Sequence, residues 1–106
     1  MTSIEKTIVV FRAERSRPND VTAVFPYEPA DYAGRLMSCY AHIGQHSSCS
    51  MSWYRTTRAA KPHEYADLKA ELENYGSSPE SRYILEVRQR IPHNAHDKRQ
   101  NNRTFV

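Results

Sequence analysis

The sequence predicts an α+β fold, in which a small antiparallel-dominated sheet of about four strands carries one main helix packed on one face. Three observations support this prediction. Several short runs alternate with the period of a strand, one longer segment repeats apolar residues with the period of a helix, and turn-forming residues separate these runs. The chain has 106 residues, of which 39% are hydrophobic and 25% charged. Its size predicts one domain at 1–92, and its composition predicts a disordered basic tail at 93–106.

A hairpin is expected at the start of the chain. Residues 5–14 (EKTIVVFRAE) are rich in β-branched side chains on both faces, which is typical of a strand covered on both sides. Residues 18–20 (PND) favour a turn, and residues 21–25 (VTAVF) return as a second strand. Residues 26–34 (PYEPADYAG) contain two prolines and a glycine, so we expect a loop or a single helical turn there.

The middle of the chain predicts one further strand and a loop. Residues 35–43 (RLMSCYAHI) form the expected third strand, in which odd and even positions face opposite sides of the sheet. Residues 44–52 (GQHSSCSMS) are small and polar, which predicts a loop. Residues 53–60 (WYRTTRAA) fit neither period, and their structure is left open.

The clearest element is a helix at 62–75, which has an apolar stripe at positions i, i+3, i+7 and i+10. Pro62 suits the first turn of a helix and Gly76 suits its end. Lys69 and Glu73 have the spacing of an ion pair on the solvent face. We expect the stripe to pack on inward residues of the strands; the stripe is Tyr65, Leu68, Leu72 and Tyr75, and the expected partners include Tyr83, Leu85 and Val87.

Positive charge is concentrated at the end of the chain. Residues 1–81 contain nine Lys/Arg and ten Asp/Glu, a balance of −1, whereas residues 82–106 contain six and two, a balance of +4. Residues 82–91 (RYILEVRQRI) alternate strictly, which predicts a half-buried last strand with a charged outer face. Such basic strand faces, together with the tail, predict nucleic-acid binding as one possible role. The arginines concerned are Arg12, Arg15, Arg17, Arg82, Arg88 and Arg90.

Two cysteines and two histidines stand at the spacing C-x2-H-x3-H-x2-C, at Cys39, His42, His46 and Cys49. Zinc needs four such ligands that converge on one ion. A strand would place Cys39 and His42 on opposite faces, and a helix would spread the four side chains along about 16 Å. We therefore expect no metal and no cofactor. A disulfide is disfavoured because the chain shows no signal segment or membrane span, which predicts a cytoplasmic location with reduced thiols.

The sequence favours a non-enzymatic role, because no catalytic motif is recognisable. A Cys/His nucleophilic pair needs a third group to orient the base, and the stretch at 39–49 contains no carboxylate. The three glycines, at 34, 44 and 76, are too scattered to form a phosphate-binding loop, and there is no G-x-S-x-G motif.

The pattern VVFR…VTAVFPYEPADY…CYAHIGQH…EYADLKAELE resembles a family of small uncharacterised proteins found in prophages and other bacterial mobile elements. The resemblance covers residues 8–90, and its most specific pieces are FPYEPADY, HIGQH and EYADLKAEL. It implies the order strand, strand, loop, strand, helix, strand, and an accessory protein encoded by such an element. It implies no catalytic role.

Protein binding is the favoured function, because amphipathic side chains are dense in the predicted loops. Tyr, Trp and Arg bury a large area while keeping a polar tip, which makes them the main carriers of interface energy. We expect FPYEPADY to fold over the sheet end that carries the histidines. The resulting surface would contact a host or element-encoded protein through Tyr32, Tyr40, His42, His46, Trp53, Tyr54 and Arg55. Nucleic-acid binding is the alternative.

Overall fold

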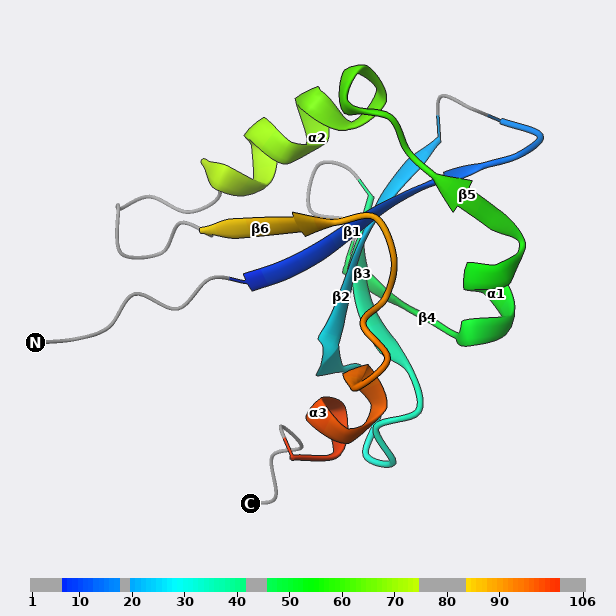
Figure 1. Cartoon of the computed structure of the whole chain (residues 1–106), viewed down its shortest axis with the longest axis vertical. Coiled ribbons are helices and arrows are strands. Elements are labelled where there is room, and N and C mark those ends of the chain that lie inside the picture. The colour runs from blue at the N-terminus through cyan, green and yellow to red at the C-terminus, as the bar shows by residue number, and fades with distance from the viewer. Residues whose placement is uncertain (1–6, 18–19, 42–45, 75–83, 102–106) are drawn as a thin grey trace, which may run out of the picture.

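The computed structural model describes residues 7–17, 20–41, 46–74 and 84–101, apart from the side chain of His46. It confirms an α+β fold with a mostly antiparallel sheet (Figure 1). The described residues form six strands and three helices, more than the four strands and one main helix that we expected. The elements are β1 (Thr7–Glu14), β2 (Val21–Pro29), β3 (Met37–Tyr40), β4 (His46–Cys49), α1 (Met51–Arg55), β5 (Thr57–Ala59), α2 (Pro62–Glu73), β6 (Leu85–Arg88) and α3 (Ala95–Asn101).

β1 is an inner strand of the sheet, whose order is β4-β3-β2-β1-β5 with β6 also paired to β1. One edge of β1 pairs with β2 in an antiparallel hairpin. The other edge is shared end to end by two strands: β6 runs parallel to residues 7–10, and β5 runs antiparallel to residues 12–14. Both edges of β1 are therefore paired, which satisfies its backbone hydrogen-bonding groups inside the protein.

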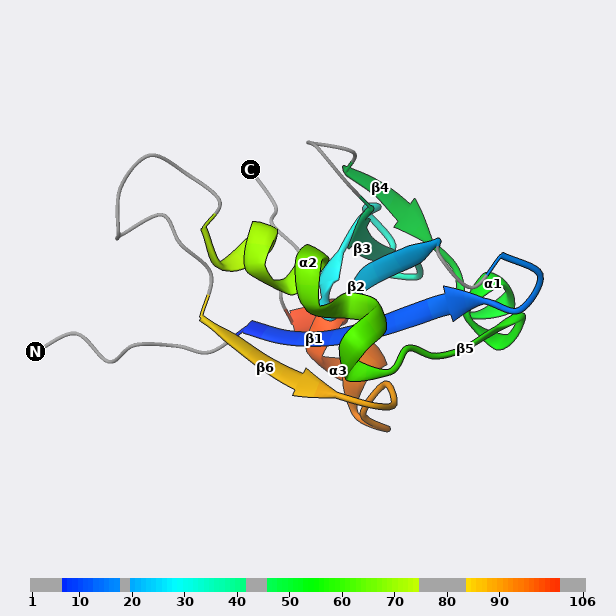
Figure 2. The ribbon, with the colours of Figure 1, turned by 90° about the horizontal axis from the view of Figure 1, so that it is seen from above.

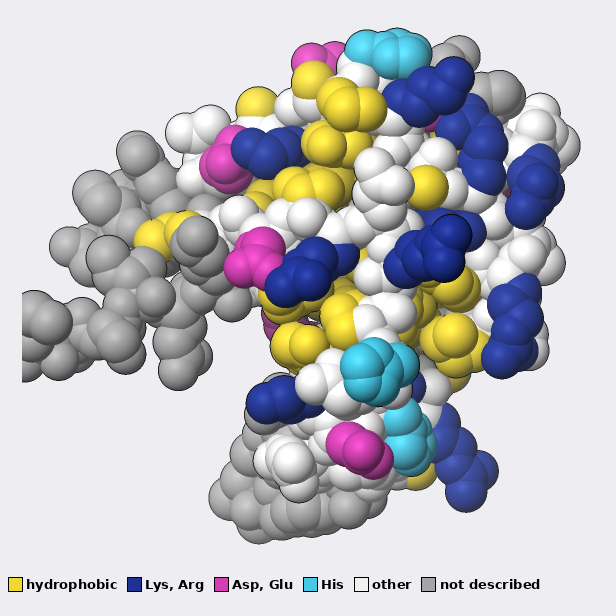
Figure 3. All heavy atoms as spheres, viewed as in Figure 1, with side chains coloured by type: hydrophobic (Ala, Val, Ile, Leu, Met, Phe, Trp, Pro, Cys, Tyr) yellow, Lys and Arg dark blue, Asp and Glu magenta, His cyan; other side chains and the backbone are white. Residues whose placement is uncertain are grey.

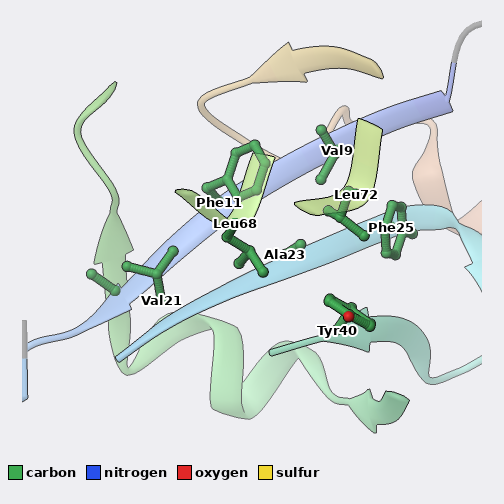
Figure 4. Close-up of a cluster of buried hydrophobic side chains, with 9 residues drawn as sticks. Val9, Phe11, Val21, Ala23, Phe25, Tyr40, Leu68 and Leu72 are labelled. Atoms are coloured by element: carbon green, nitrogen blue, oxygen red, sulfur yellow. The ribbon is translucent and has the colours of Figure 1, made fainter. Parts of the chain in front are cut away.

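The sheet is buried on both faces. On one face, Val9, Phe11 and Ala13 of β1 join Leu68 and Leu72 of α2, and Figure 4 shows side chains of this cluster meeting between helix and strands. On the opposite face, Val10 belongs to a second cluster. That cluster consists of Val10, Val24, Met37, Cys39 and Cys49, with Met51, Trp53, Tyr54 and Ile91 packed against it. Figures 1 and 2 show α2 over the first face, whereas α1 and α3 lie on the other side.

α2 agrees closely with the predicted helix. Leu68 and Leu72 are each 1% exposed, and the ring of Tyr65 stacks on Phe11 with 4.4 Å between ring centroids. Leu85 and Val87 of β6 pack against the same cluster, as expected. The predicted ion pair is present, with 2.9 Å between Lys69 Nζ and Glu73 Oε2. The remaining predicted residues of this contact, Tyr75, Gly76 and Tyr83, lie outside the described residues.

Two segments that we expected to be loops belong to the sheet or to a helix. β2 continues to Pro29, and the turn that follows is held by Asp31, whose Oδ1 accepts the backbone N–H groups of Arg35 and Leu36. Gly34 has a φ of 69°, in the left-handed region that glycine adopts without steric cost. The polar stretch after it contains β4 and the start of α1. The prediction of a loop at 44–52 was wrong because backbone pairing with β3 forms β4, although the serines of β4 show no apolar alternation.

The segment after Pro92 also differs from the disordered tail that we expected, because residues 95–101 form α3. Ala95 and Arg99 are buried, and Arg99 donates from Nε to the carbonyl of Gly34 (3.0 Å) and from Nη1 to that of Pro26 (2.8 Å). Polar contacts attach this helix to β2, and a pattern search based on apolar periodicity does not detect them. Residues 102–106 lie outside the described residues. None of the described helices is long and apolar enough to cross a membrane.

Leu68→Ala tests the contact between α2 and the sheet. The side chain is fully buried, so its loss should reduce the free energy of unfolding by about 2–5 kcal/mol. Urea denaturation of the variant and of the exposed control Asp67→Ala measures this effect. Equal midpoints for the two variants would show that Leu68 does not pack on the strands.

Glu64→Gln tests the junction between β5 and α2. Glu64 accepts two hydrogen bonds from Arg58 (2.8 and 2.7 Å) and one from the backbone of Lys61 (2.8 Å), which together lower its pKa from 4.5 to about 2. A carboxyl with a lowered pKa stabilises the fold above its ordinary pKa, and this stabilisation is lost as the pH falls through the folded value. We expect the variant to melt below the wild type at neutral pH, and the difference to shrink between pH 4.5 and about 2.

Thermal melts of wild type, Glu64→Gln and Asp67→Asn over that pH range measure the effect. Asp67 is an exposed carboxylate of the same helix, so its variant controls for the general loss of one negative charge. A Glu64→Gln difference that stays constant down to pH 2 would contradict the assignment.

Candidate functional site

The second face of the sheet is divided by the short helix α1. The side chain of Ser50 caps this helix by accepting the backbone N–H of Trp53 (3.1 Å). Ser50 and Trp53 line a cavity of about 400 Å³ toward β3 and β4. Met51 and Tyr54, on the adjacent side of the same helix, line a second cavity of about 480 Å³ toward α3, which we call the α1–α3 hollow.

Basic side chains line much of the α1–α3 hollow. Three arginines and two histidines reach it from the β2–β3 turn, the segment after β6, and α3, and no Asp or Glu is among the described residues that line it. Figure 3 shows histidine side chains over α3, with apolar and basic side chains nearby and one acidic side chain beside them. The lining consists of Arg35, Arg90, His93, His96 and Arg99, together with Met51, Tyr54, Ile91, Pro92 and Ala95.

Tyr54 is held in place by a buried arginine. The guanidinium carbon of Arg12 lies 4.2 Å from the centroid of the Tyr54 ring, a cation–π contact. Arg12 also donates from Nε to Thr57 Oγ1 (2.8 Å) and from Nη2 to the Thr57 carbonyl (2.7 Å). The Tyr54 hydroxyl accepts the backbone N–H of Ile91 (3.2 Å), which ties the segment after β6 to α1. Arg12 therefore positions one wall of the hollow.

Arg99 is a second buried cation and lines the hollow itself. It is 3% exposed, and its side chain donates hydrogen bonds to the backbone carbonyls of Gly34 and Pro26. Desolvation lowers the pKa of both Arg12 and Arg99, but a guanidinium keeps its proton in proteins. Carbonyl oxygens carry partial charges, so they satisfy the hydrogen bonds without cancelling the full positive charge. Asp31 acts on Arg99 through space, but its Oδ1 already accepts two backbone N–H groups.

The arginines that the sequence suggested for nucleic-acid binding are not gathered on one surface. Arg12 is buried, and Arg15 donates to the Thr57 carbonyl (3.4 Å). Arg17 pairs with Glu14 and Asp20, and Arg88 pairs with Glu86. Of the described members, Arg90 alone lines the α1–α3 hollow. Arg82 lies outside the described residues.

Four of the five basic lining residues were not predicted from the sequence: Arg35, His93, His96 and Arg99. The last three follow one another at steps of three residues, a spacing typical of one side of a helix, and His96 and Arg99 belong to α3. That spacing was a signal for a basic helical face within the segment that we expected to be disordered. Arg35 carried no comparable signal, because the β2–β3 turn brings it to the hollow.

The residues expected to bind a protein are divided between the two faces of the sheet. Tyr40 is 1% exposed in the cluster under α2, and its hydroxyl donates to Glu71. Trp53 and Tyr54 are half-buried against the opposite face. Tyr32 is 85% exposed, and Arg55 is exposed at the end of α1. His42 and the side chain of His46 lie outside what the structure describes, so the expected histidine rim stays a prediction.

Of the four residues of the Cys/His motif, the structure describes the side chains of the two cysteines. Among the described side chains, no group of three or more His, Cys, Asp or Glu residues is placed to hold a metal ion. Cys39 and Cys49 are free thiols, both buried.

Comparison of the chain with protein-family models, with curated proteins and with solved structures found no match. The resemblance to mobile-element proteins therefore stays an expectation from the sequence, and the function has to be argued from the site.

Arg12→Lys tests whether Arg12 is a structural residue. Lysine keeps the charge but loses the planar fork that bonds Thr57 at two atoms, so the free energy of unfolding should fall by roughly 1–3 kcal/mol. The matched control is Arg15→Lys, an exposed neighbour whose contact with the same carbonyl is longer, at 3.4 Å. Denaturant titration measures both variants. A stable Arg12→Lys variant would instead indicate that Arg12 is available for ligands.

Proposed function

We propose that this chain binds single-stranded nucleic acid, with the backbone phosphates held in the α1–α3 hollow. One observation carries the proposal: five basic side chains line a single hollow whose described lining contains no carboxylate. Phosphate contacts by Lys and Arg supply most of the affinity of sequence-independent nucleic-acid binding.

The three arginines of the hollow differ in exposure and in hydrogen bonding, so we assign them different roles. Arg35 and Arg90 are exposed and form no ion pair within the described residues, so their guanidinium groups are available to bind phosphate. Arg99 is committed to the carbonyls of Gly34 and Pro26 and adds a fixed positive charge. His93 and His96 supply further ring nitrogens as hydrogen-bonding groups at the mouth.

The shape of the hollow favours a single strand over a duplex. Its volume of about 480 Å³ is within the range of small-ligand pockets, and its apolar lining suits a sugar or a base. A flexible single strand can place one nucleotide into such a hollow, whereas a duplex keeps its bases stacked inside. Tyr54 adds an aromatic ring to the wall, the kind of residue on which such proteins stack bases.

Protein binding, the function favoured by the sequence, has weaker support. Of its seven residues, Tyr32 and Arg55 are the exposed ones among the described side chains, and Tyr40 is buried. A partner encoded by a mobile element stays an expectation from the resemblance.

Arg35→Ala and Arg90→Ala test the proposal. Each should weaken the binding of a short labelled oligothymidylate and lower the slope of log K against log salt by about 0.7, the value for one lost contact on a single strand. Fluorescence anisotropy over a series of salt concentrations measures both quantities.

Arg17→Ala is the control, because Arg17 is exposed but already paired with Glu14 and Asp20 at the β1–β2 turn. If Arg17→Ala weakens binding as much as Arg90→Ala, the contact is diffuse and the hollow is not the site. If the wild type shows no salt-dependent binding to the oligonucleotide, the proposed function is wrong.

A further inference from the structure

Cys39 and Cys49 lie side by side on the hairpin of β3 and β4. In the register of these strands Cys39 is opposite Ser47 and Cys49 is opposite Met37, so the two cysteines are diagonal neighbours on one face of the sheet. Both belong to the second apolar cluster, and both line the 400 Å³ cavity beside Trp53, which we call the thiol cavity. Cys49 was expected in a loop, and the structure instead places it on a strand next to Cys39.

The surroundings of the two thiols are not equivalent. A hydrogen bond from the Cys49 thiol lowers the pKa of Cys39 to about 6, against the opposing effect of burial. Ser47, whose Oγ lies 3.0 Å from Cys39 Sγ, adds a smaller contribution that also lowers the pKa. The hydrogen bond between the two cysteines, together with burial, raises the pKa of Cys49. Cys49 has one proton and a second acceptor, the Met37 carbonyl at 3.6 Å. The asymmetry favours the thiolate on Cys39 and the proton on Cys49.

We propose that Cys39 and Cys49 form a peroxide-reactive thiol pair, in which Cys39 is oxidised first and Cys49 then closes a disulfide. The reactive form of a cysteine is the thiolate, and a neighbouring thiol acts as the resolving group. Neither residue contributes to the proposed nucleic-acid site, so this inference stands independently of it.

The reaction is balanced with hydrogen peroxide as the oxidant. The Cys39 sulfur attacks one peroxide oxygen, the O–O bond breaks, and Cys39 becomes a sulfenic acid while hydroxide leaves. The Cys49 sulfur then attacks the Cys39 sulfur, the S–O bond breaks, and its proton leaves with the hydroxyl as water. Two electrons pass from the two sulfurs to peroxide, and the products are one disulfide, one water and one hydroxide. The hydroxide becomes a second water by taking up the proton that the Cys39 thiol released when it ionised.

The thiol cavity gives a small oxidant a route to these residues. Cys39 and Cys49 are 4% and 6% exposed, so a bulky reagent meets a barrier, but peroxide is small and uncharged. The rest of the described lining is mostly small or polar, and it carries one acidic side chain, Glu14. Trp53, which is the single tryptophan of the chain, lies in the same lining and can report on the thiols.

Closing the disulfide requires a modest movement of β4. Diagonal neighbours of an antiparallel pair have Cα atoms about 7–8 Å apart, whereas a disulfide usually spans 4.4–6.8 Å, roughly an ångström less. β4 has four residues and is at the end of the strand order among the described elements, so it can shift more readily than an inner strand. A disulfide formed under such strain is more easily reduced, which makes the reaction reversible.

Peroxide titration of the whole chain tests this inference. We expect the loss of two thiols per chain without dimerisation, a change in Trp53 fluorescence, and recovery of both signals with dithiothreitol. Cys49→Ser should stop at a sulfenic acid on Cys39, which dimedone traps and peptide mass spectrometry locates. Cys39→Ser should react at least tenfold more slowly, because burial still raises the pKa of the remaining Cys49 thiol and favours its protonated form. Oxidation of Cys39→Ser at the wild-type rate, or intermolecular disulfides alone, would overturn the proposal.

A second measurement needs no variant and covers the case in which the serine variants do not fold. The rate of iodoacetamide labelling is followed against pH in the native wild type, and each cysteine is identified by its peptide. Labelling of Cys39 should reach its plateau near neutral pH, because its pKa is about 6. If Cys39 and Cys49 label equally, with rates that keep rising above pH 8, the thiols are ordinary and the proposal fails.

Discussion

β1 is the strand on which the rest of this structure depends, because both of its faces and both of its edges are covered. Val9 and Val10, which point in opposite directions, are each fully buried. A strand of this kind forces the remaining elements onto two layers. α2 covers one layer, where Leu68 and Leu72 pack into the apolar cluster of the strands. The other layer is left to α1, α3 and the segment between β6 and α3, and the candidate sites are found there.

The two helices of that layer are too short to close it. α1 has five residues and α3 has seven, so together they cover the sheet with gaps. Arginine side chains take the place of apolar ones: Arg12 extends beneath Tyr54, and Arg99 extends toward Pro26 and Gly34. Burial of a guanidinium costs desolvation energy, and the hydrogen bonds to carbonyl oxygens offset part of that cost. The layer is thereby held by polar contacts that also leave it positively charged.

The sequence predicted the elements whose stability comes from apolar packing. β1, β2 and α2 have strong periods, and Leu68, Leu72, Leu85 and Val87 meet as expected. β4 and α3 were missed because other forces form them: backbone pairing for the serines of β4, and the hydrogen bonds of Arg99 for α3. The same difference between periodic packing and polar contacts explains which site residues could be predicted from the sequence. Arg90 was identified from strand alternation, but the approach of Arg35 and Arg99 depends on a turn and on a polar anchor, and neither has a period that can be read along the chain.

The two candidate sites share one short stretch of backbone. Cys49 ends β4, Ser50 caps α1, and Met51 lines the α1–α3 hollow, so a thiol of the pair, the helix cap and a wall of the hollow are consecutive residues. Arg99 is also close enough to Cys49 for the two to interact through space. A displacement of β4 of the size that disulfide closure needs would therefore act directly on the residues that begin α1. Ser50 and Trp53 line one cavity and Met51 and Tyr54 line the other, so this short helix is a wall shared by both candidate sites.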